Sequence, residues 1–326
     1  MLYLIYLPVL YFCLLLYFRL AAHFQITDKP NHRSSHHQIT IRGGGIVFPL
    51  ALLIHFLFYG FEYPLFTSGL LLISLISFYD DLKPLSNKLR LLVHLISVSL
   101  LFMQTDLMHY PLWIIIPVYI LVIGTINAIN FMDGINGITG AYSLVTILSL
   151  YFINESQLSF IKSDWLIVSA LALLVFSFFN FREKAKCFAG DVGSVSMAFI
   201  IIFFLLLLII QSGDLKYIGL LLIYGLDTVS TIIFRLIRRE NIFEAHRSHF
   251  YQYLANVKGL PHLQVSSIYM LIQGIVNLLI IYSDWDSLAF LTFILLSGLV
   301  FVGMRFVVEG KEHLMGKELA NEKISK

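Results

Sequence analysis

A nearly unbroken succession of apolar runs dominates this chain of 326 residues and constrains its fold more than any other feature. A helix that crosses a bilayer needs about 20 mostly apolar residues, and the chain offers about eleven such runs. In lipid these runs must be helical, because every backbone polar group needs a partner within its own segment. They cover residues 2–22, 44–60, 66–79, 90–105, 111–129, 137–153, 164–180, 193–211, 215–234, 264–283 and 287–307. We therefore expect an all-α polytopic membrane protein with about eleven transmembrane helices.

The composition supports lipid as the main solvent of this chain. Hydrophobic residues make up 58% of it and charged residues only 13%, whereas a soluble domain carries about 25% charge. The net charge of +2 is too small to indicate a nucleic-acid partner. Since the apolar runs follow one another closely, residues 1–326 are interpreted as a single integral-membrane domain, in which residues 308–326 form a charged tail.

The distribution of lysine and arginine predicts the orientation, because cytoplasmic loops carry an excess of both. Of the 22 lysines and arginines, only Lys162 and Lys216 fall on loops of one side. The side with the other basic residues is therefore predicted to be cytoplasmic. The N-terminus then lies outside, and the C-terminus with its tail lies in the cytoplasm.

Unusual polar clusters occur only on the basic side. The first spans residues 28–37, which include Asn31, and is closed by the glycines 43–45. Glycines at a helix entry let backbone N–H groups approach an anion, so Asn31 and Gly44 are candidate substrate-binding residues. A flexible basic loop is the alternative.

The second cluster is the pair Asp80-Asp81, at the end of an apolar run. Adjacent carboxylates are costly near lipid, and they suit metal-linked phosphate chemistry with Lys88 as a phosphate clamp. The alternative is a solvated helix end with local ion pairs.

The third cluster places Asn127, Asn130 and Asp133 on roughly one face of a helix, because they recur every three residues. Amide and carboxylate oxygens are hard ligands that suit Mg²⁺. Gly134 and Gly137 would end the helix and open the backbone to a ligand. The alternative is a capped helix end followed by a turn.

The fourth cluster sets Asp191 between Gly190 and Gly193 at a helix start. Asp191 is either an N-cap or a metal ligand, and Phe188 is available to stack on a base.

The fifth cluster lies in the longest basic loop, residues 235–262, which contains His246, Arg247 and His249. Such a group suits a pyrophosphate bound through charge-assisted hydrogen bonds. Contact of the loop with anionic lipid is the alternative.

Asp227 is an acid inside an apolar run, with Arg235 as its nearest possible partner in the sequence. An intramembrane acid and glycine-interrupted helices also fit a secondary transporter. A transporter, however, places its polar groups near the midplane of the bilayer, whereas here they gather at one interface.

Together the clusters supply acids and amides for a metal, bases for phosphate, and glycines for close approach. A soluble pyrophosphate donor and a lipid phosphate acceptor are both anionic, so their reaction needs a divalent cation and basic side chains.

These motifs resemble those of the polyprenyl-phosphate N-acetylhexosaminyl-1-phosphate transferases. That family includes bacterial enzymes that initiate O-antigen, capsule and teichoic-acid synthesis, and phospho-N-acetylmuramoyl-pentapeptide transferase. The matching motifs are Asp28-x-Pro30-Asn31 with the glycines 43–45, Asp80-Asp81, Asn127-x-x-Asn130-x-x-Asp133, Gly190-Asp191 and the histidine-containing loop.

The resemblance implies transfer of a sugar-1-phosphate from a UDP-N-acetylhexosamine to undecaprenyl or another polyprenyl phosphate, with release of UMP. It implies Mg²⁺ as cofactor, with Mn²⁺ as an alternative, and a multi-pass protein of the inner (plasma) membrane whose active site faces the cytoplasm. The expected partners are the two substrates and the lipid bilayer, and a homodimer is compatible with the family.

The resemblance also implies roles for single residues. It gives the metal to Asp191 and Asn130, the orientation or deprotonation of the attacking phosphate to Asp80 with Asp81 beside it, and a further catalytic role to Asp133. Lys88 would contact the pyrophosphate, Phe188 and Asn136 the uracil, and His246, Arg247 and His249 the donor phosphate or sugar. Direct attack by the lipid phosphate and a covalent phospho-Asp80 intermediate both remain open, and direct attack is favoured.

Two departures from the family pattern bear on these expectations. Asn136 stands where many bacterial members carry Asp, so that position needs no charge. The loop reads His246-Arg247-Ser248-His249 rather than three consecutive histidines. This argues against phospho-N-acetylmuramoyl-pentapeptide transferase, which stays the alternative, and favours the enzymes that start O-antigen or capsule chains.

Overall fold

The computed structural model describes residues 2–29, 35, 38–242, 244 and 246–316, and the candidate Asn31 lies outside them. Within these residues, a helix occupies each of the expected apolar runs. The long helices are α1 (Tyr6–His23), α2 (Val47–Phe58), α3 (Pro64–Leu82), α4 (Asn87–Gln104), α5 (Leu112–Met132), α6 (Ile138–Ser156), α7 (Ser163–Asn180), α8 (Gly190–Ser212), α9 (Leu222–Ile237), α11 (His262–Tyr282) and α12 (Ser287–Glu309).

Shorter elements fill the connections. They are the 3₁₀ helices η1 (Leu2–Ile5), η2 (Gly44–Ile46), η3 (Leu107–His109) and η4 (Leu215–Leu221), the helices α10 (Phe250–Asn256) and α13 (Lys311–Met315), and the antiparallel strands β1 (Thr27–Asp28) and β2 (Thr40–Ile41). The described part of the predicted tail thus contains the end of α12 and α13, which Arg238 Nη1 joins to α9 by donating to the Leu314 carbonyl at 3.0 Å.

Eight helical segments in the described part of the chain are long and apolar enough to cross a membrane. A shorter apolar segment, Gly44–Phe58, accompanies them. The expected all-α multi-pass membrane protein is therefore confirmed, while the number of about eleven crossings and the orientation stay predictions.

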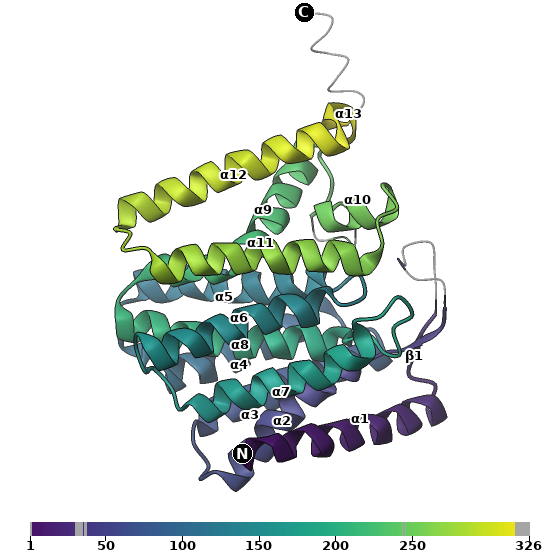
Figure 1. Cartoon of the computed structure of the whole chain (residues 1–326), viewed down its shortest axis with the longest axis vertical. Helices are drawn as coiled ribbons and strands as arrows, with labels where there is room; N and C mark the ends of the chain where they lie inside the picture. The colour runs from purple at the N-terminus through teal and green to yellow at the C-terminus, as the bar shows by residue number, and fades with distance from the viewer. Residues whose placement is uncertain (1, 30–34, 36–37, 243, 245, 317–326) are drawn as a thin grey trace, which may run out of the picture.

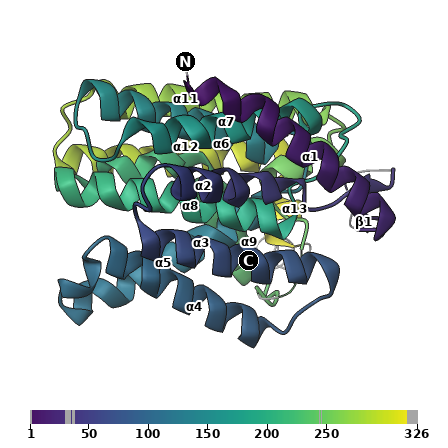
Figure 2. The ribbon, with the colours of Figure 1, turned by 90° about the horizontal axis from the view of Figure 1, so that it is seen from below.

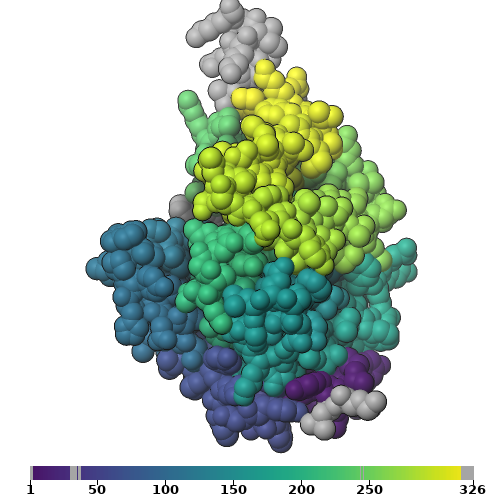
Figure 3. Space-filling view, turned by 60° about the vertical axis from the view of Figure 1, so that its left-hand side comes forward, coloured from purple at the N-terminus to yellow at the C-terminus, as the bar shows by residue number. Residues whose placement is uncertain are grey.

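The long helices lie nearly side by side (Figure 1), and α8 runs through their centre. Seen from below, α8 has α6, α7 and α11 on one side and α3, α4 and α5 on the other (Figure 2). In its most apolar window α8 is 83% buried, whereas α12 is only 11% buried. Helix α12 lies across the top of the molecule with a largely open surface (Figure 3), as expected of a helix in contact with lipid.

Glycines set the distance between the start of α2 and the start of α8. A Cβ atom on Gly45 would lie 2.2 Å from the Cα atom of Gly193, so only glycine permits this approach. The amide groups of Gly44 and Gly45 donate to the carbonyls of Phe188 and Ala189 at 2.8 and 3.0 Å. This close contact brings the first and the fourth polar clusters together.

Candidate active site

The described parts of all five polar clusters lie at one end of the helix bundle, on the right in Figure 1. The Phe188 amide donates to the Ile41 carbonyl at 2.8 Å, and Asn136 Nδ2 donates to the Arg182 carbonyl at 2.9 Å. Tyr251 of α10 donates its hydroxyl proton to the carbonyl of Phe131 at 2.9 Å. The structure thus brings these separate loops together, while their joint role as one site and the side of the membrane stay predictions.

Asp81 is the centre of an ion-pair network with Arg42 and Asp191. Its carboxylate accepts from the amides of Asp191 (2.9 Å) and Val192 (3.0 Å), at the N-terminus of α8, where unpaired N–H groups favour an anion. Arg42 Nε donates to Asp81 at 2.6 Å, and Arg42 Nη2 lies 3.3 Å from Asp191 Oδ1. The Asp81 side chain is fully buried, whereas that of Asp191 is 22% exposed. Asp81 therefore holds α3 to α8, and Asp191 is the acid that can meet a ligand.

Asp80 points away from this ion-pair network and has other partners. It accepts from the Leu85 amide at 2.6 Å and from Arg90 Nη1 at 3.0 Å, so it fixes the turn between α3 and α4. Two cavities, described below, open at this end of the bundle, and neither Asp80 nor Asp81 is among the described residues that line them. Their predicted contact with the attacking phosphate finds no support in these contacts, because local bonds already satisfy both carboxylates.

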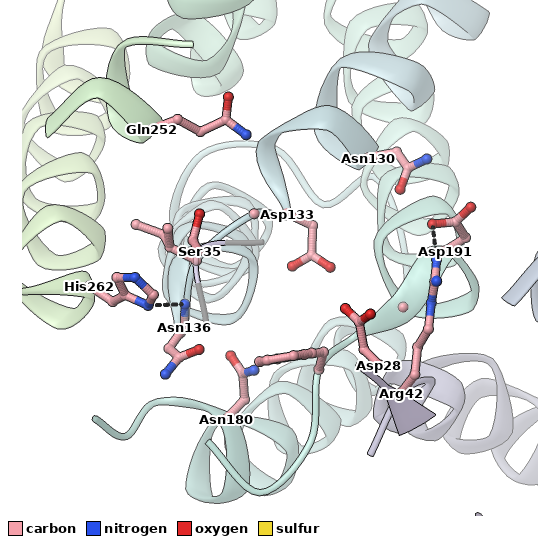
Figure 4. A pocket seen from close by; sticks show the side chains of 14 residues that line it. Asp28, Ser35, Arg42, Asn130, Asp133, Asn136, Asn180, Asp191, Gln252 and His262 are labelled. Atoms are coloured by element: carbon pink, nitrogen blue, oxygen red, sulfur yellow. Dashed lines mark hydrogen bonds and ion pairs between the residues drawn. The ribbon is translucent and has the colours of Figure 1, made fainter. Parts of the chain in front are cut away.

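A cavity of about 240 Å³ opens beside the ion-pair network of Asp81 and is lined mainly by oxygen-bearing side chains. In Figure 4 the carboxylates of Asp28 and Asp133 point into it, with Asn130 and Asp191 on one wall and His262 on the other. The described residues around it are Asp28, Ser35, Arg42, Asn130, Asp133, Gly134, Ile135, Asn136, Asn180, Phe188, Gly190, Asp191, Gln252 and His262. Three carboxylates face one arginine, so the wall is rich in negative charge.

Asp133 follows the last residue of α5 and is surrounded by protein. Burial raises the pKa of this carboxyl to about 6, although the Thr139 hydroxyl, which donates to it at 2.6 Å, lowers the pKa, and the Asp81 charge adds a smaller increase. A carboxyl with such a pKa changes its protonation close to neutral pH, as general acids and bases do.

The asparagine side chains of the third cluster differ in their roles: some line the cavity, and others only hold the surrounding backbone. Asn130 Oδ1 accepts from the Ser194 hydroxyl at 2.7 Å and lies beside Asp191 on the cavity wall. Asn136 also lines the cavity, but its Nδ2 group is bound to the carbonyls of Arg182 and Glu183. Asn127 donates to the carbonyl four residues before it and thus contributes to the helix.

A second cavity of about 870 Å³ adjoins the first, and Ser35, Asn136, Phe188 and His262 line both. Its wall carries the basic residues Arg247 and Lys184 beside Glu183, together with apolar residues just before and at the start of α11. Ligand sites commonly have volumes of about 300–1,000 Å³, so the two cavities together offer room for a substrate of the size of a nucleotide-sugar.

The two histidines of the fifth cluster stack on each other, with ring centroids 5.0 Å apart. His249 Nδ1 lies 3.3 Å from Asp227 Oδ1 inside the protein. Burial, with smaller effects of the neighbouring His249 and Arg235, lowers the pKa of His246 to about 4. His246 is therefore neutral at neutral pH in this conformation, and the phosphate contact expected of it stays a prediction. Of the three predicted loop residues, Arg247 is the one that lines a cavity.

Gly44 and Lys88, both expected to bind substrate, have other surroundings than predicted. Gly44 gives its amide proton to Phe188, as described above, so this glycine packs helices together and its N–H group is not available to an anion. Lys88 is exposed in the first turn of α4 and is not among the described residues that line either cavity. Arg90, two residues later, is the base that pairs with an acid of this region.

The cavity also contains residues that the sequence analysis did not single out. Arg42 neutralises Asp81 and Asp191, and its position directly before three glycines was the available signal. Gln252 and His262 come from α10 and from the start of α11, where His262 Nδ1 lies 3.4 Å from the Asn136 amide. Asn180 accepts from the Gly137 amide at 2.8 Å. No motif marks Gln252, His262 and Asn180, because they come from α10, the start of α11 and the end of α7, and only the folded chain brings them together.

A divalent cation fits the donor chemistry of the smaller cavity. The described residues contain no group of three or more His, Cys, Asp or Glu side chains arranged to hold a metal ion. Mg²⁺, however, is commonly bound by one or two carboxylates together with water and substrate phosphates. Asp191 and Asn130 offer such hard oxygen ligands on one wall, and the excess of carboxylates favours a cation.

The fold and the site define an α-helical membrane protein with an acidic cavity at one end of its bundle, and comparison with known proteins shows which proteins it resembles. Residues 63–209 match the model of glycosyl transferase family 4. This match and the relatives described next confirm the family resemblance that the motifs indicated.

Two bacterial relatives are named for similar activities. The chain is 27% identical to a probable undecaprenyl-phosphate N-acetylglucosaminyl 1-phosphate transferase of Bacillus subtilis, over 78% of this chain and 76% of the relative. It is 28% identical to the undecaprenyl-phosphate alpha-N-acetylglucosaminyl 1-phosphate transferase of Thermotoga maritima, over 69% and 71%. A phospho-N-acetylmuramoyl-pentapeptide-transferase of Dictyoglomus thermophilum is 29% identical, over 61% of this chain and 70% of the relative.

Proposed function

We propose that this protein transfers an N-acetylhexosamine-1-phosphate from a UDP-sugar to undecaprenyl or another polyprenyl phosphate, in a Mg²⁺-dependent reaction that releases UMP. The observation that carries the proposal is the junction of two cavities at the end of the bundle. One is lined mainly by carboxylates and amides, and the other carries Arg247 and Lys184 beside Glu183 and apolar residues, with Phe188 at the junction of both. The curated relatives support sugar-phosphate transfer to a polyprenyl phosphate.

The charges of the two cavities suit the two halves of a nucleotide-sugar differently. In the larger cavity Arg247 and Lys184 attract phosphate, and Phe188 at the junction can stack on the uracil ring. In the smaller cavity the carboxylates would repel a pyrophosphate unless a cation lay between them. Asp191 and Asn130 would hold Mg²⁺, or Mn²⁺, which would neutralise the pyrophosphate and stabilise the charge that develops during transfer.

The chain's own residues would then orient the reaction. An oxygen of the lipid phosphate attacks the phosphorus that carries the sugar, and the bond from this phosphorus to the oxygen of UMP breaks. Asp133, with its pKa of about 6, is placed to take up a proton from the incoming phosphate near neutral pH. Direct attack is preferred over a phospho-Asp80 intermediate, because Asp80 is already bound to Arg90 and to the Leu85 amide.

The proposed setting is the inner (plasma) membrane, with the site on the cytoplasmic side where UDP-sugars are dissolved. The excess of lysine and arginine on that side of the chain supports this orientation. The product would be the first lipid-linked sugar of a cell-surface polysaccharide such as an O-antigen, a capsule or a teichoic-acid-like polymer.

A panel assay tests the proposal. Membranes that contain the protein are incubated with several UDP-N-acetylhexosamines, with and without undecaprenyl phosphate and Mg²⁺, and UMP release and the lipid product are measured. We expect a product only when all three components are present. UMP release that does not depend on the lipid phosphate would refute the proposed acceptor.

The second candidate is phospho-N-acetylmuramoyl-pentapeptide transferase, because a relative of similar identity carries that name. UDP-N-acetylmuramoyl-pentapeptide belongs in the same panel. If it alone gave a lipid product, this second function would replace the first.

A further inference from the structure

The last long helix carries an ion pair that its apolar surroundings do not explain. Although α12 is the least buried of the candidate spans, Arg305 and Glu309 on it have side chains that are only 1% exposed. Both oxygens of Glu309 accept from Arg305, at 2.5 and 3.2 Å. Removing two charges from water is expensive, and a buried ion pair adds little net stability by itself. The position of this pair therefore calls for a role other than stability.

Every donor of the Arg305 guanidinium is in use. A guanidinium has five N–H donors, and Glu309 accepts two of them. Nη1 donates to the hydroxyls of Ser230 and Thr231 at 2.9 Å each, and Nη2 donates to the Ser248 carbonyl at 2.9 Å. Arg305 thus has no donor left for a substrate, and it joins α12 and α9 to the middle of the loop that contains Arg247.

The same network continues from Thr231 to the start of α10. The Thr231 hydroxyl donates to Asp227 at 3.2 Å. Asp227 also accepts from the amides of Phe250 (2.9 Å) and Tyr251 (3.2 Å), and from the Tyr269 hydroxyl at 2.7 Å. Asp227 therefore fixes the first turn of α10, and Arg305 fixes the residues directly before it.

Two cavity residues lie on either side of these anchored atoms. Arg247, next to Ser248, lines the larger cavity, and Gln252, in the first turn of α10, lines the smaller one. We propose that Arg305 and Glu309 are positioning residues that hold the segment 246–252 in the conformation that binds the UDP-sugar. The inference rests on the proposed function, and it predicts that the affinity for the donor depends on two residues of an otherwise apolar outer helix.

The test removes the ion pair without leaving an unpaired buried charge. Replacement of a buried ion pair by apolar residues of similar volume is often neutral for stability, so Arg305→Met combined with Glu309→Leu should fold. We expect kcat/KM for the UDP-sugar to fall between about tenfold and a hundredfold, as for a group misplaced by about 1 Å. The loss should appear in the KM for the UDP-sugar, with the KM for polyprenyl phosphate unchanged. The matched control, Lys162→Met with Glu62→Leu, removes an ion pair at the opposite end and should leave both constants unchanged.

A second measurement does not depend on activity. Amide hydrogen exchange of residues 246–252 should become faster in the double variant, while exchange in α8 stays as in the wild type. Arg305→Lys keeps the charge but offers only three donors, so it should show the same two effects, and it decides the question if the double variant does not fold. Wild-type exchange and an unchanged KM in a folded variant would overturn the proposal. If the wild-type protein transferred no sugar phosphate, the exchange measurement would still show whether the pair holds the loop.

Discussion

Asp133 offers the sharpest test of the electrostatics of the site. Burial raises the pKa of its carboxyl from 3.8 to about 6. The folded protein therefore holds this proton more tightly than the unfolded chain does, and stability falls as the pH rises through the interval from about 4 to about 6. A shift of about two pKa units corresponds to about 3 kcal/mol. The free energy of unfolding is lower by this amount above that pH interval than below it.

Asp133→Asn removes the ionisation and keeps an oxygen that can accept from the Thr139 hydroxyl. We expect the variant to be more stable than the wild type by about 3 kcal/mol near pH 8, and by about half of that near pH 5. The same variant should transfer little or no sugar phosphate, because the carboxylate is lost from the cavity.

Thermal unfolding in detergent with a metal chelator measures the effect. A thiol-reactive dye can report it, because Cys187 is buried in the folded protein. Asp106→Asn, which changes an exposed acid at the other end of the bundle, is the control and should have no pH-dependent effect. An Asp133→Asn variant that is less stable than the wild type near pH 8, or equally stabilised at both pH values, would refute the assigned pKa.

Three other predictions follow from the site and the packing. Asp191→Asn should abolish UMP release at every Mg²⁺ concentration while the protein stays folded, and full activity would remove the metal assignment. Lys162→Cys should be active and react with a membrane-impermeant maleimide from outside the cell, whereas Lys184→Cys should react only after permeabilisation; the reverse pattern would invert the orientation. Gly45→Ala should sharply lower the yield of folded protein, because its Cβ atom would lie 2.2 Å from the Gly193 backbone, whereas Gly124→Ala, with open space around its Cβ position, should not; equal yields would contradict the packing.

The helices were predictable from the sequence because lipid leaves an apolar run few alternatives to a helix. The meeting of the loops was predictable too, since runs that alternate in direction bring every second loop to the same end. Asp191, Asn130, Asp133 and Phe188 accordingly lie around one cavity, as their motifs indicated.

The partners of the charged groups were not predictable, because they come from distant parts of the chain. Arg235, the expected partner of Asp227, instead binds Glu240 and the carbonyls of the following loop. Asp227 binds His249, Tyr269 and two backbone amides. Arg235 was the expected partner because it is near Asp227 in the sequence. A side chain on a helix, however, contacts the elements that pack against its face of that helix.

The charge balance of the site links these contacts to the proposed chemistry. Arg42 pairs with the buried Asp81 and with Asp191, and its charge also acts on Asp28 and Asp133, so one arginine faces three carboxylates among the described residues that line the cavity. Burial makes this negative charge costly, and Asp133 responds by keeping its proton up to about pH 6. Near neutral pH the Asp133 carboxyl is therefore mostly ionised, and on the proposed mechanism it can accept the proton of the incoming lipid phosphate. A divalent cation held by Asp191 and Asn130 would offset the remaining negative charge of the cavity, so that a pyrophosphate could bind beside this base.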